Sequence, residues 1–195
     1  MNYKDHSFSG EEIRGDLFEN VTFAGCRFAG ANLKFTSFTN CTFERCDLTG
    51  VVLDGTAFEH CSFPESKLSN LDFSPAVFIK CDFAGSAIEN SVFQKLKSGG
   101  KSETMRYDLR ECTFEKAELS NTIFVKCNLE KVNFAHAKLS RASFDRCKLT
   151  KAMLVGADIN GASFEGSIID KTELGYDGLA QFAMSRGFVL GTEWV

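Results

Sequence analysis

The sequence predicts an all-β fold, a quadrilateral β-helix of about eight coils with one projecting loop and a short C-terminal helix. Phe, Leu or Ile recurs at every fifth residue from Phe8 to Leu174 with one interruption, and we call these positions centres. The residue two places before a centre is small in most units, and the other three are mostly polar, charged or Gly. A five-residue unit cannot bury its large side chain alone, so such units must stack as in a solenoid.

Columns of like residues predict four units per turn. Every fourth centre tends to repeat its residue type, as in one column of Phe18, Phe38, Phe58 and Phe78. The 32 centres then make about eight turns of 20 residues each. Adjacent turns would pair as parallel strands about 4.8 Å apart, which gives a rod roughly 38 Å long. In the first turn His6, Glu11 and Asp16 take small-residue positions, so we expect a frayed or capping turn.

The cysteines agree with this arrangement. All eight lie two places before a centre: Cys26, Cys41, Cys46, Cys61, Cys81, Cys112, Cys127 and Cys147. An even count is also typical of a disulfide framework, but the parallel side-chain directions of stacked neighbours disfavour bridging. The sequence has no Cys-x-x-Cys pair, so a metal site is not expected either. We therefore predict buried free thiols.

The repeat is interrupted between Phe93 and Leu109 by about 11 extra residues. The columns keep their residue types across this interruption if the coil resumes on its next side. We therefore predict one β-helix domain over residues 1–175, with a loop insertion at 95–106 that projects from an unbroken coil. Tyr107 takes a small-residue position just after the loop, so we expect local distortion there.

The sequence of residues 176–195 indicates a C-terminal segment that serves in capping and dimerisation. Within it, residues 177–186 predict a short helix with Asp177 as N-cap and Gly187 as C-terminal stop. Leu179, Phe182 and Ala183 would share one face of this helix. An open coil exposes its core and an unpaired strand edge, so the segment should cover the end or join two copies as a homodimer. The candidate dimerisation residues are Leu179, Phe182, Phe188, Val189 and Leu190.

The sequence shows no arrangement typical of catalysis. His6, His60 and His136 fall in different repeats without triad-like partners, and no P-loop, dinucleotide fingerprint or zinc helix is present. We therefore expect no enzyme, no catalytic residue, no cofactor and no metal. The sequence also contains no secretory signal and no apolar run of membrane length, so we expect a cytoplasmic protein that does not bind a membrane.

Charge is distributed unevenly along the chain. The whole chain carries −4, residues 1–93 carry −6, residues 94–106 carry +3, and residues 107–175 are balanced. An acidic face on a rod can compete for a nucleic-acid groove, because DNA also presents regularly spaced negative charge. The alternative explanation is ordinary solubility. Net acidity also argues against direct binding of nucleic acid.

The unit Ala31-Asn32-Leu33 follows the pattern small–(Asp/Asn)–(Leu/Phe)–x–x, and residues 6–175 resemble the pentapeptide-repeat family throughout. The projecting loop and the terminal helix further resemble the quinolone-resistance (Qnr) proteins. Residues 183–191 are similar to their closing Met-x-x-x-Gly-hydrophobic segment, with one residue fewer before the Gly. The resemblance implies a right-handed β-helix that dimerises through its C-terminal ends, mimics DNA and protects DNA gyrase and topoisomerase IV from quinolones. Many of these relatives have two loops, whereas this chain has one clear loop.

Two functions remain open at this stage. The first is a DNA-mimicking protein that binds a type II topoisomerase and protects it from quinolones. The second is an interaction scaffold or effector with another protein partner. In both cases we expect the loop to contact the partner, because binding residues tend to lie on loops held by rigid scaffolds. Its candidate binding residues are Lys95, Leu96, Lys97, Lys101, Met105 and Arg106.

Overall fold

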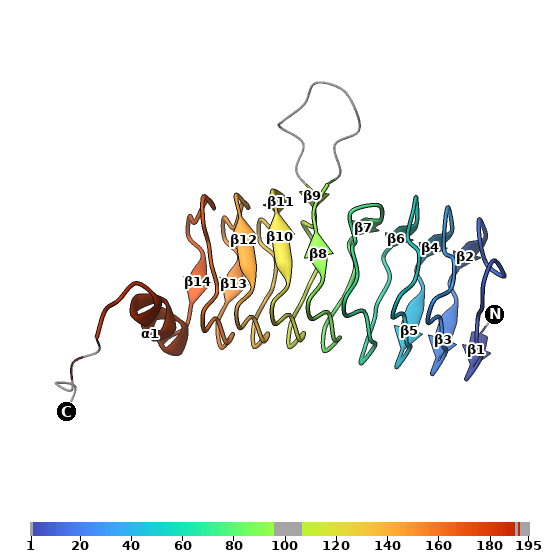
Figure 1. The fold of residues 1–195 in the computed structure, drawn as a ribbon, viewed down its shortest axis with the longest axis horizontal. Helices are drawn as coiled ribbons and strands as arrows, with labels where there is room; N and C mark the ends of the chain where they lie inside the picture. Colours follow the sequence, from blue (N-terminus) through green and yellow to red (C-terminus); the bar gives the residue numbers. More distant parts are fainter. Residues whose placement is uncertain (1, 96–106, 190, 192–195) are drawn as a thin grey trace, which may run out of the picture.

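The computed structural model describes residues 2–95, 107–189 and 191. In these residues the chain winds as a β-solenoid of about eight turns, which lie side by side along the long axis of the molecule (Figure 1). The N-terminus lies at one end, and helix α1 (Tyr176–Ser185) lies at the other (Figure 1). The predicted all-β coil with a short C-terminal helix is therefore confirmed.

Short strands on successive turns pair in parallel and mark the sides of the coil. The β2 side holds β2 (Leu17–Glu19), β4 (Ser37–Thr39), β6 (Ala57–Glu59) and β7 (Val77–Ile79), followed beyond the insertion by β9 (Tyr107–Asp108) and β11 (Cys127–Asn128). The β3 side holds β1 (Asn2–Lys4), β3 (Thr22–Ala24), β5 (Thr42–Glu44), β13 (Met153–Leu154) and β14 (Glu173–Leu174). The β10 side holds β8 (Val92–Phe93), β10 (Ile123–Val125) and β12 (Ser143–Asp145). Isolated bridges, such as that of Arg27 with Asp47, hold the fourth side, which we call the bridge side.

The pairing register shows how the five-residue repeat becomes a coil. Paired residues are 20 apart, as Phe18 and Phe38 are, which corresponds to four units. Across the insertion the offset becomes 31, and Phe93 pairs with Phe124. The difference of 11 residues leaves the coil in register on both sides of the insertion. The prediction that the coil resumes on its next side is confirmed.

Columns of stacked Phe rings fill the interior. Phe43, Phe63 and Phe83 stack with ring centroids 5.0 Å apart and interplanar angles of 9° and 6°. Rings from adjoining sides meet edge to face, as Phe58 meets Phe63 at 5.4 Å and 70°. Offset stacks and edge-to-face contacts are the arrangements that the ring quadrupole favours. The centres therefore form one continuous buried core.

The small residues form a second set of columns, which bond to the backbone. Thr56 Oγ1 donates to the carbonyl of Leu33 at 2.8 Å, and Ser66 Oγ donates to the carbonyl of Phe43 at 2.6 Å. The Cys61 thiol lies 3.4 Å from the carbonyl of Phe38 in the same way. In each case the acceptor is the centre residue 23 positions earlier, one turn back. All eight cysteines are buried and free, as predicted.

Most corners of the coil have left-handed backbone. The residue two places after a centre has positive φ at these corners, between 50° at Lys126 and 78° at Gly15, and Pro75 is an exception. Gly and Asn adopt this conformation most readily, and other residues there need support. The Phe35 ring lies so close over Gly55, one turn further on, that a Cβ at Gly55 would be 2.7 Å from the Phe35 Cδ1 atom. Gly55 therefore leaves the space that the exposed Phe35 ring occupies.

The first turn begins earlier than the sequence predicts. Tyr3 on β1 takes a centre position and stacks on Phe23 at 5.3 Å and 6°. The five-residue pattern of Phe, Leu and Ile missed it because the residue is Tyr. His6 is exposed at this open end, and its Nε2 atom lies 3.2 Å from Glu12 Oε1. This contact agrees with the expected capping turn.

Helix α1 starts at a different residue from the one predicted. Its N-cap is Gly175, and no side chain caps the helix, so the prediction of Asp177 as N-cap is wrong. Gly175 lies beside the preceding turn as the chain leaves β14, since a Cβ there would be in van der Waals contact with the Gly156 nitrogen at 3.5 Å. Gly187 follows the C-cap residue with φ of 86°, so the predicted C-terminal stop is confirmed.

The face that α1 turns toward the coil also differs from the prediction. Gly178 is the buried residue of the helix, and Phe182 packs against Phe164 with ring centroids 6.2 Å apart. Phe182 and Ala183 are half-buried, but Leu179 is 56% exposed. Leu179 therefore does not share the inward face, because Gly178 is the residue that allows the helix to approach the last turn.

Candidate functional site

The loop residues proposed for partner binding lie mostly beyond what the structure describes. Lys95 is the last described residue before the loop and is exposed. The other five lie outside the described residues: Leu96, Lys97, Lys101, Met105 and Arg106. What the structure places is the base of the loop, formed where β8 ends and β9 begins. This base is part of the stacked coil.

Tyr107 fixes the returning end of the loop. It is buried, and its hydroxyl, with one proton to donate, lies between two acceptors, the carbonyls of Phe73 at 3.0 Å and Ala76 at 2.9 Å. Ser and Thr at equivalent positions bond to the centre residue 23 positions earlier, and across the 11 inserted residues this offset becomes 34. Phe73 is therefore the acceptor that a Ser or Thr at position 107 would also reach. Its backbone pairs with Cys127 in the regular register, so the local distortion expected at Tyr107 is not present. Burial raises the pKa of Tyr107 well above its usual value, which keeps the hydroxyl protonated as a donor.

Exposed aliphatic side chains border the base of the loop. Val77 and Ile79 are exposed on β7, directly after Ala76, whose carbonyl binds Tyr107. Ile123 is exposed on β10, where it pairs with Val92 of β8. Outward positions of this kind are mostly polar elsewhere in the repeat, so these residues are an addition to the predicted site. In the sequence these residues are recognisable as Val and Ile at outward positions, where the repeat otherwise has mostly polar residues.

The C-terminal end carries an apolar surface. Of the predicted dimerisation residues, Leu179, Phe188 and Val189 are exposed, at 56%, 68% and 93%. Phe182 is half-buried against the coil, and Leu190 lies outside the described residues. The structure adds Ile169, Leu174, Tyr176 and Met184 as exposed residues of the last turn and helix. We call these seven exposed residues the end surface: Ile169, Leu174, Tyr176, Leu179, Met184, Phe188 and Val189.

Two members of the end surface occupy centre positions that the repeat predicts as inward. Ile169 is 54% exposed and Leu174 is 36% exposed. They belong to the last turn, and no further turn stacks on them. Helix α1 provides a hydrogen-bond acceptor for another part of this edge, since Gln181 Oε1 accepts a hydrogen bond from the backbone N–H of Ile159 at 2.7 Å. The helix therefore caps the coil incompletely.

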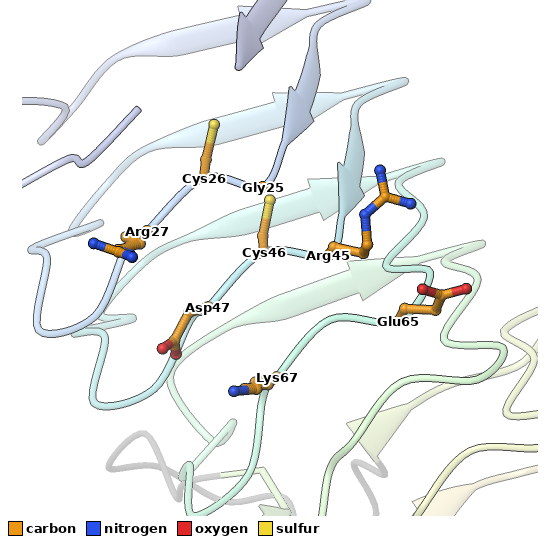
Figure 2. A pocket seen from close by; sticks show the side chains of 8 residues that line it. All are labelled: Gly25, Cys26, Arg27, Arg45, Cys46, Asp47, Glu65 and Lys67. Carbon is orange, nitrogen blue, oxygen red and sulfur yellow. The ribbon is translucent and has the colours of Figure 1, made fainter. Parts of the chain in front are cut away.

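A shallow groove of about 370 Å³ lies on the corner between the β3 side and the bridge side (Figure 2). It is lined by Gly25, Cys26, Arg27, Arg45, Cys46, Asp47, Glu65 and Lys67. Arg27, Asp47 and Lys67 come from three successive turns and alternate in charge (Figure 2). Burial opposes ionisation of Asp47, but hydrogen bonds from Thr49 and the two cations hold the pKa of its carboxyl below the usual value.

The two thiols that line the groove are buried and belong to the core. Burial raises the pKa of Cys46 to about 12, so this thiol is neither nucleophilic nor acidic near neutral pH. Within residues 2–95 and 107–189, no three His, Cys, Asp or Glu side chains are grouped to hold a metal ion. In the same part of the chain, no helix is long and apolar enough to cross a membrane.

Comparison with known proteins agrees with this geometry. The family model described as "Pentapeptide repeat region" matches residues 17–93 and 106–174. A trypsin-treated variant of QnrB1, a plasmid-mediated fluoroquinolone resistance protein, has a TM-score of 0.66 at 18% identity over 98% of both chains. Full-length QnrB1 has a TM-score of 0.59 at 17% identity over 96% of this chain and 97% of its own.

A further pentapeptide-repeat structure is more distant. It is HetL, a protein involved in heterocyst differentiation regulation from the cyanobacterium Nostoc sp. strain PCC 7120. HetL has 16% identity over 91% of this chain and 90% of its own, with a TM-score of 0.31. The curated proteins include no match. The family model covers well over half of the sequence, and its five-residue repeats stack, four to a turn, into the coil. The chain therefore belongs to the pentapeptide-repeat family.

Proposed function

We propose that this protein binds a type II topoisomerase, DNA gyrase or topoisomerase IV, in the cytoplasm and protects it from quinolones. The observation that carries the proposal is the likeness to QnrB1, a fluoroquinolone resistance protein, over 98% of both chains. An identity of 18% supports a shared fold, and the activity is the part that requires a test. The protein acts by binding, since the described surface offers charged and apolar patches in place of a reaction centre.

The partner contacts belong to the loop and its base in this proposal. Lys95, Lys97, Lys101 and Arg106 give the loop a positive charge suited to an acidic surface on the partner. Leu96 and Met105 add apolar anchors. The exposed Val77, Ile79 and Ile123 around the base extend the apolar contact onto the coil. The coil itself presents the loop on a rigid support, because Phe93 and Tyr107 at the two ends of the insertion are both buried.

The acidic first half gives the rod a second role. Residues 1–93 carry −6, and an acidic rod can occupy a groove on the topoisomerase that otherwise holds DNA. The protein then mimics DNA and does not bind nucleic acid itself. We further propose that two copies join through the end surface, since seven exposed apolar residues gather there.

The alternative is an interaction scaffold with another protein partner. The balanced charge of residues 107–175 favours it, because mimicry along the whole rod would require negative charge on both halves. The two functions differ in one measurable property. Only the first requires the protein to restore supercoiling by gyrase in the presence of a quinolone.

A supercoiling assay with gyrase and ciprofloxacin tests the proposal. The intact protein should restore supercoiling, and a variant that lacks residues 96–106 should not. Removing these 11 residues returns the spacing of Phe93 and Leu109 to one ordinary unit, so the coil should stay folded. Circular dichroism and thermal unfolding of the deletion variant provide the control. Absence of protection by the intact protein would favour the scaffold, and full protection by the deletion variant would assign the contact to the coil alone.

A further inference from the structure

Three lysines stack on one corner of the coil in its C-terminal half. Lys131, Lys151 and Lys171 each lie two places after a centre, on the corner between the β2 side and the β3 side. All three are exposed, and their φ values are 62°, 59° and 53°. The backbone N–H of Lys131 donates to the carbonyl of Thr150, the neighbour of Lys151, so consecutive turns are in contact. We call these residues the lysine ladder.

None of the three ladder lysines forms an ion pair in the described chain, and the same is true of the corner residues Lys126 and Arg141. Four other basic corner residues each contact a carboxylate within 3.2 Å: Arg45 with Glu44, Lys80 with Glu111, Lys116 with Glu115, and Arg146 with Asp145. Beside Lys131, the carboxylate of Glu130 is taken by Lys148 at 2.6 Å. Lys151 follows Thr150, which carries no charge. Across residues 2–95 and 107–189, no carboxylate forms an ion pair with any of the three lysines, Asp170 and Glu173 included.

Such a ladder destabilises the isolated coil in two ways. Like charges on neighbouring strands repel each other, and turns of a β-helix are only about 4.8 Å apart. A left-handed corner also favours Gly or Asn over Lys. The groove of Figure 2 shows the favourable arrangement, because Arg27, Asp47 and Lys67 alternate in sign on successive turns. Like charges also follow one another at Lys126 and Arg146 on another corner, but Arg146 there is paired with Asp145. The ladder is a longer run of like charges without ion pairs, and such a departure from local consistency indicates a functional surface.

Apolar side chains next to the ladder indicate the kind of partner. Met153 and Val155 are exposed on the β3 side, two and four residues after Lys151. Phosphate groups of a nucleic acid would match the ammonium groups but leave these two side chains uncovered. An acidic protein segment with apolar residues matches both. We propose that the lysine ladder, with Met153 and Val155, binds an acidic and partly apolar segment of a partner protein.

This surface is separate from the loop and meets the end surface only at Lys171, which lies between Ile169 and Leu174, so the proposal does not depend on the topoisomerase proposal. Its first test uses fluorescence anisotropy with a labelled peptide of repeated Glu-Leu-Glu-Ser units. A peptide of Glu-Ser units with equal charge tests the apolar part, and an oligothymidylate of equal charge tests nucleic acid. The ladder variant is Lys131→Gln/Lys151→Gln/Lys171→Gln. The matched control is Arg45→Gln/Lys116→Gln/Arg146→Gln, which removes the same charge from other corners.

The parent should bind the Leu-containing peptide more tightly than either other probe. The ladder variant should lose about tenfold or more in affinity, and the control should change by less than about twofold, because only local charge is complementary to the probe. Equal losses in the two variants would assign binding to overall charge. Tighter binding of oligothymidylate would assign the corner to nucleic acid. Absence of peptide binding by the parent would overturn the proposal.

A stability measurement tests the premise without any ligand. Lys151→Asn should raise the Tm, and the increase should be larger at about 20 mM than at about 500 mM salt, since salt screens repulsion between exposed charges. Lys80→Asn is the control, because Lys80 has the same left-handed backbone on the same corner but is paired with Glu111. An equal increase in Tm for Lys151→Asn and Lys80→Asn would mean that Asn stabilises only the left-handed backbone and that repulsion between the lysines contributes nothing. A loss at Lys151 would mean that the ladder is not a strained feature.

Discussion

A centre residue and the small residue before it stabilise the coil in different ways. The centre contributes buried apolar area and ring stacking, as Phe63 does between Phe43 and Phe83. The small residue contributes a hydrogen bond to a carbonyl of the previous turn, as Thr56 and Ser66 do. A thiol can take the same position because it is small, apolar and a weak donor. This shared geometry explains why Ser, Thr and Cys replace one another in these columns.

Truncation of a stacked ring should be costly. Phe63→Ala removes a fully buried side chain from the middle of a column and should lower the free energy of unfolding by about 3–5 kcal/mol. Urea denaturation measures this change. Phe188→Ala is the control, because Phe188 is largely exposed and should change the stability of the monomer little. A cost below about 1 kcal/mol at Phe63 would contradict the dense packing of the column.

Burial of the Cys46 thiol should make the coil sensitive to alkali. An unfolded thiol ionises near pH 8.5, whereas burial raises the pKa of Cys46 to about 12. The stabilisation is complete below about pH 8.5 and is lost as the pH rises toward 12, because only the unfolded chain can then release the proton. This thiol should lower the free energy of unfolding by up to about 1.4 kcal/mol per pH unit.

Urea titrations between about pH 8 and about pH 10 measure this slope. Cys46→Ser should reduce it, since Ser does not ionise in this range and Ser66 already occupies the same column one turn later. Equal slopes for the parent and Cys46→Ser would show that the thiol is not protected by burial.

Among the elements, helix α1 shows how the coil is closed. One side chain of the helix replaces the strand that would have followed, because Gln181 accepts the backbone N–H of Ile159. Gln181→Ala should leave this buried N–H without a partner and should cost about 1–3 kcal/mol. Gln181→Glu is the control, because it keeps the acceptor oxygen. Thermal unfolding and amide exchange at Ile159 measure the effect, and unchanged protection at Ile159 would contradict it.

The sequence predicted those elements whose surroundings repeat. The five-residue period located Phe93 and Phe124 on one column across the insertion. Each of these rings stacks between a Phe ring of the preceding turn and one of the following turn, so their surroundings are alike. The same period failed at the ends, where Ile169 has no turn stacked on it and is exposed. The start of α1 was also wrong, because the helix begins after Gly175 without a capping side chain, so the Asp177 signal did not apply. Periodicity describes the interior of a solenoid but not its boundaries.

The candidate sites follow the same rule. The loop was visible as a break in the period, and the apolar end was visible as a run of hydrophobic residues. The aliphatic residues at the loop base were missed because Val77 and Ile79 appear as tolerated exceptions within single units. The lysine ladder was missed because its members are 20 residues apart and meet only when the turns stack.

At the scale of the whole molecule, the end surface should join two copies of the chain. A homodimer through this surface would be a rod of about 75 Å, twice the length that the strand spacing gives for one coil. Leu179→Glu/Phe188→Glu should produce a monomer, because charge in a buried apolar interface is costly. Leu17→Glu is the control, since Leu17 is 82% exposed at the other end of the rod. Light scattering measures the mass, and a monomeric parent at micromolar concentration would contradict the dimer.

The short offset between paired strands also governs how the molecule can be built. Paired strands of the described chain are 20 residues apart, or 31 across the insertion, so each strand after the first turn finds its partner one turn earlier. The longer offset adds only about 0.4 kcal/mol of loop-closure entropy. Each turn can therefore dock on the preceding one in the order of synthesis, and the growing coil exposes one turn edge at a time. Helix α1, which follows the last turn, then covers part of that edge.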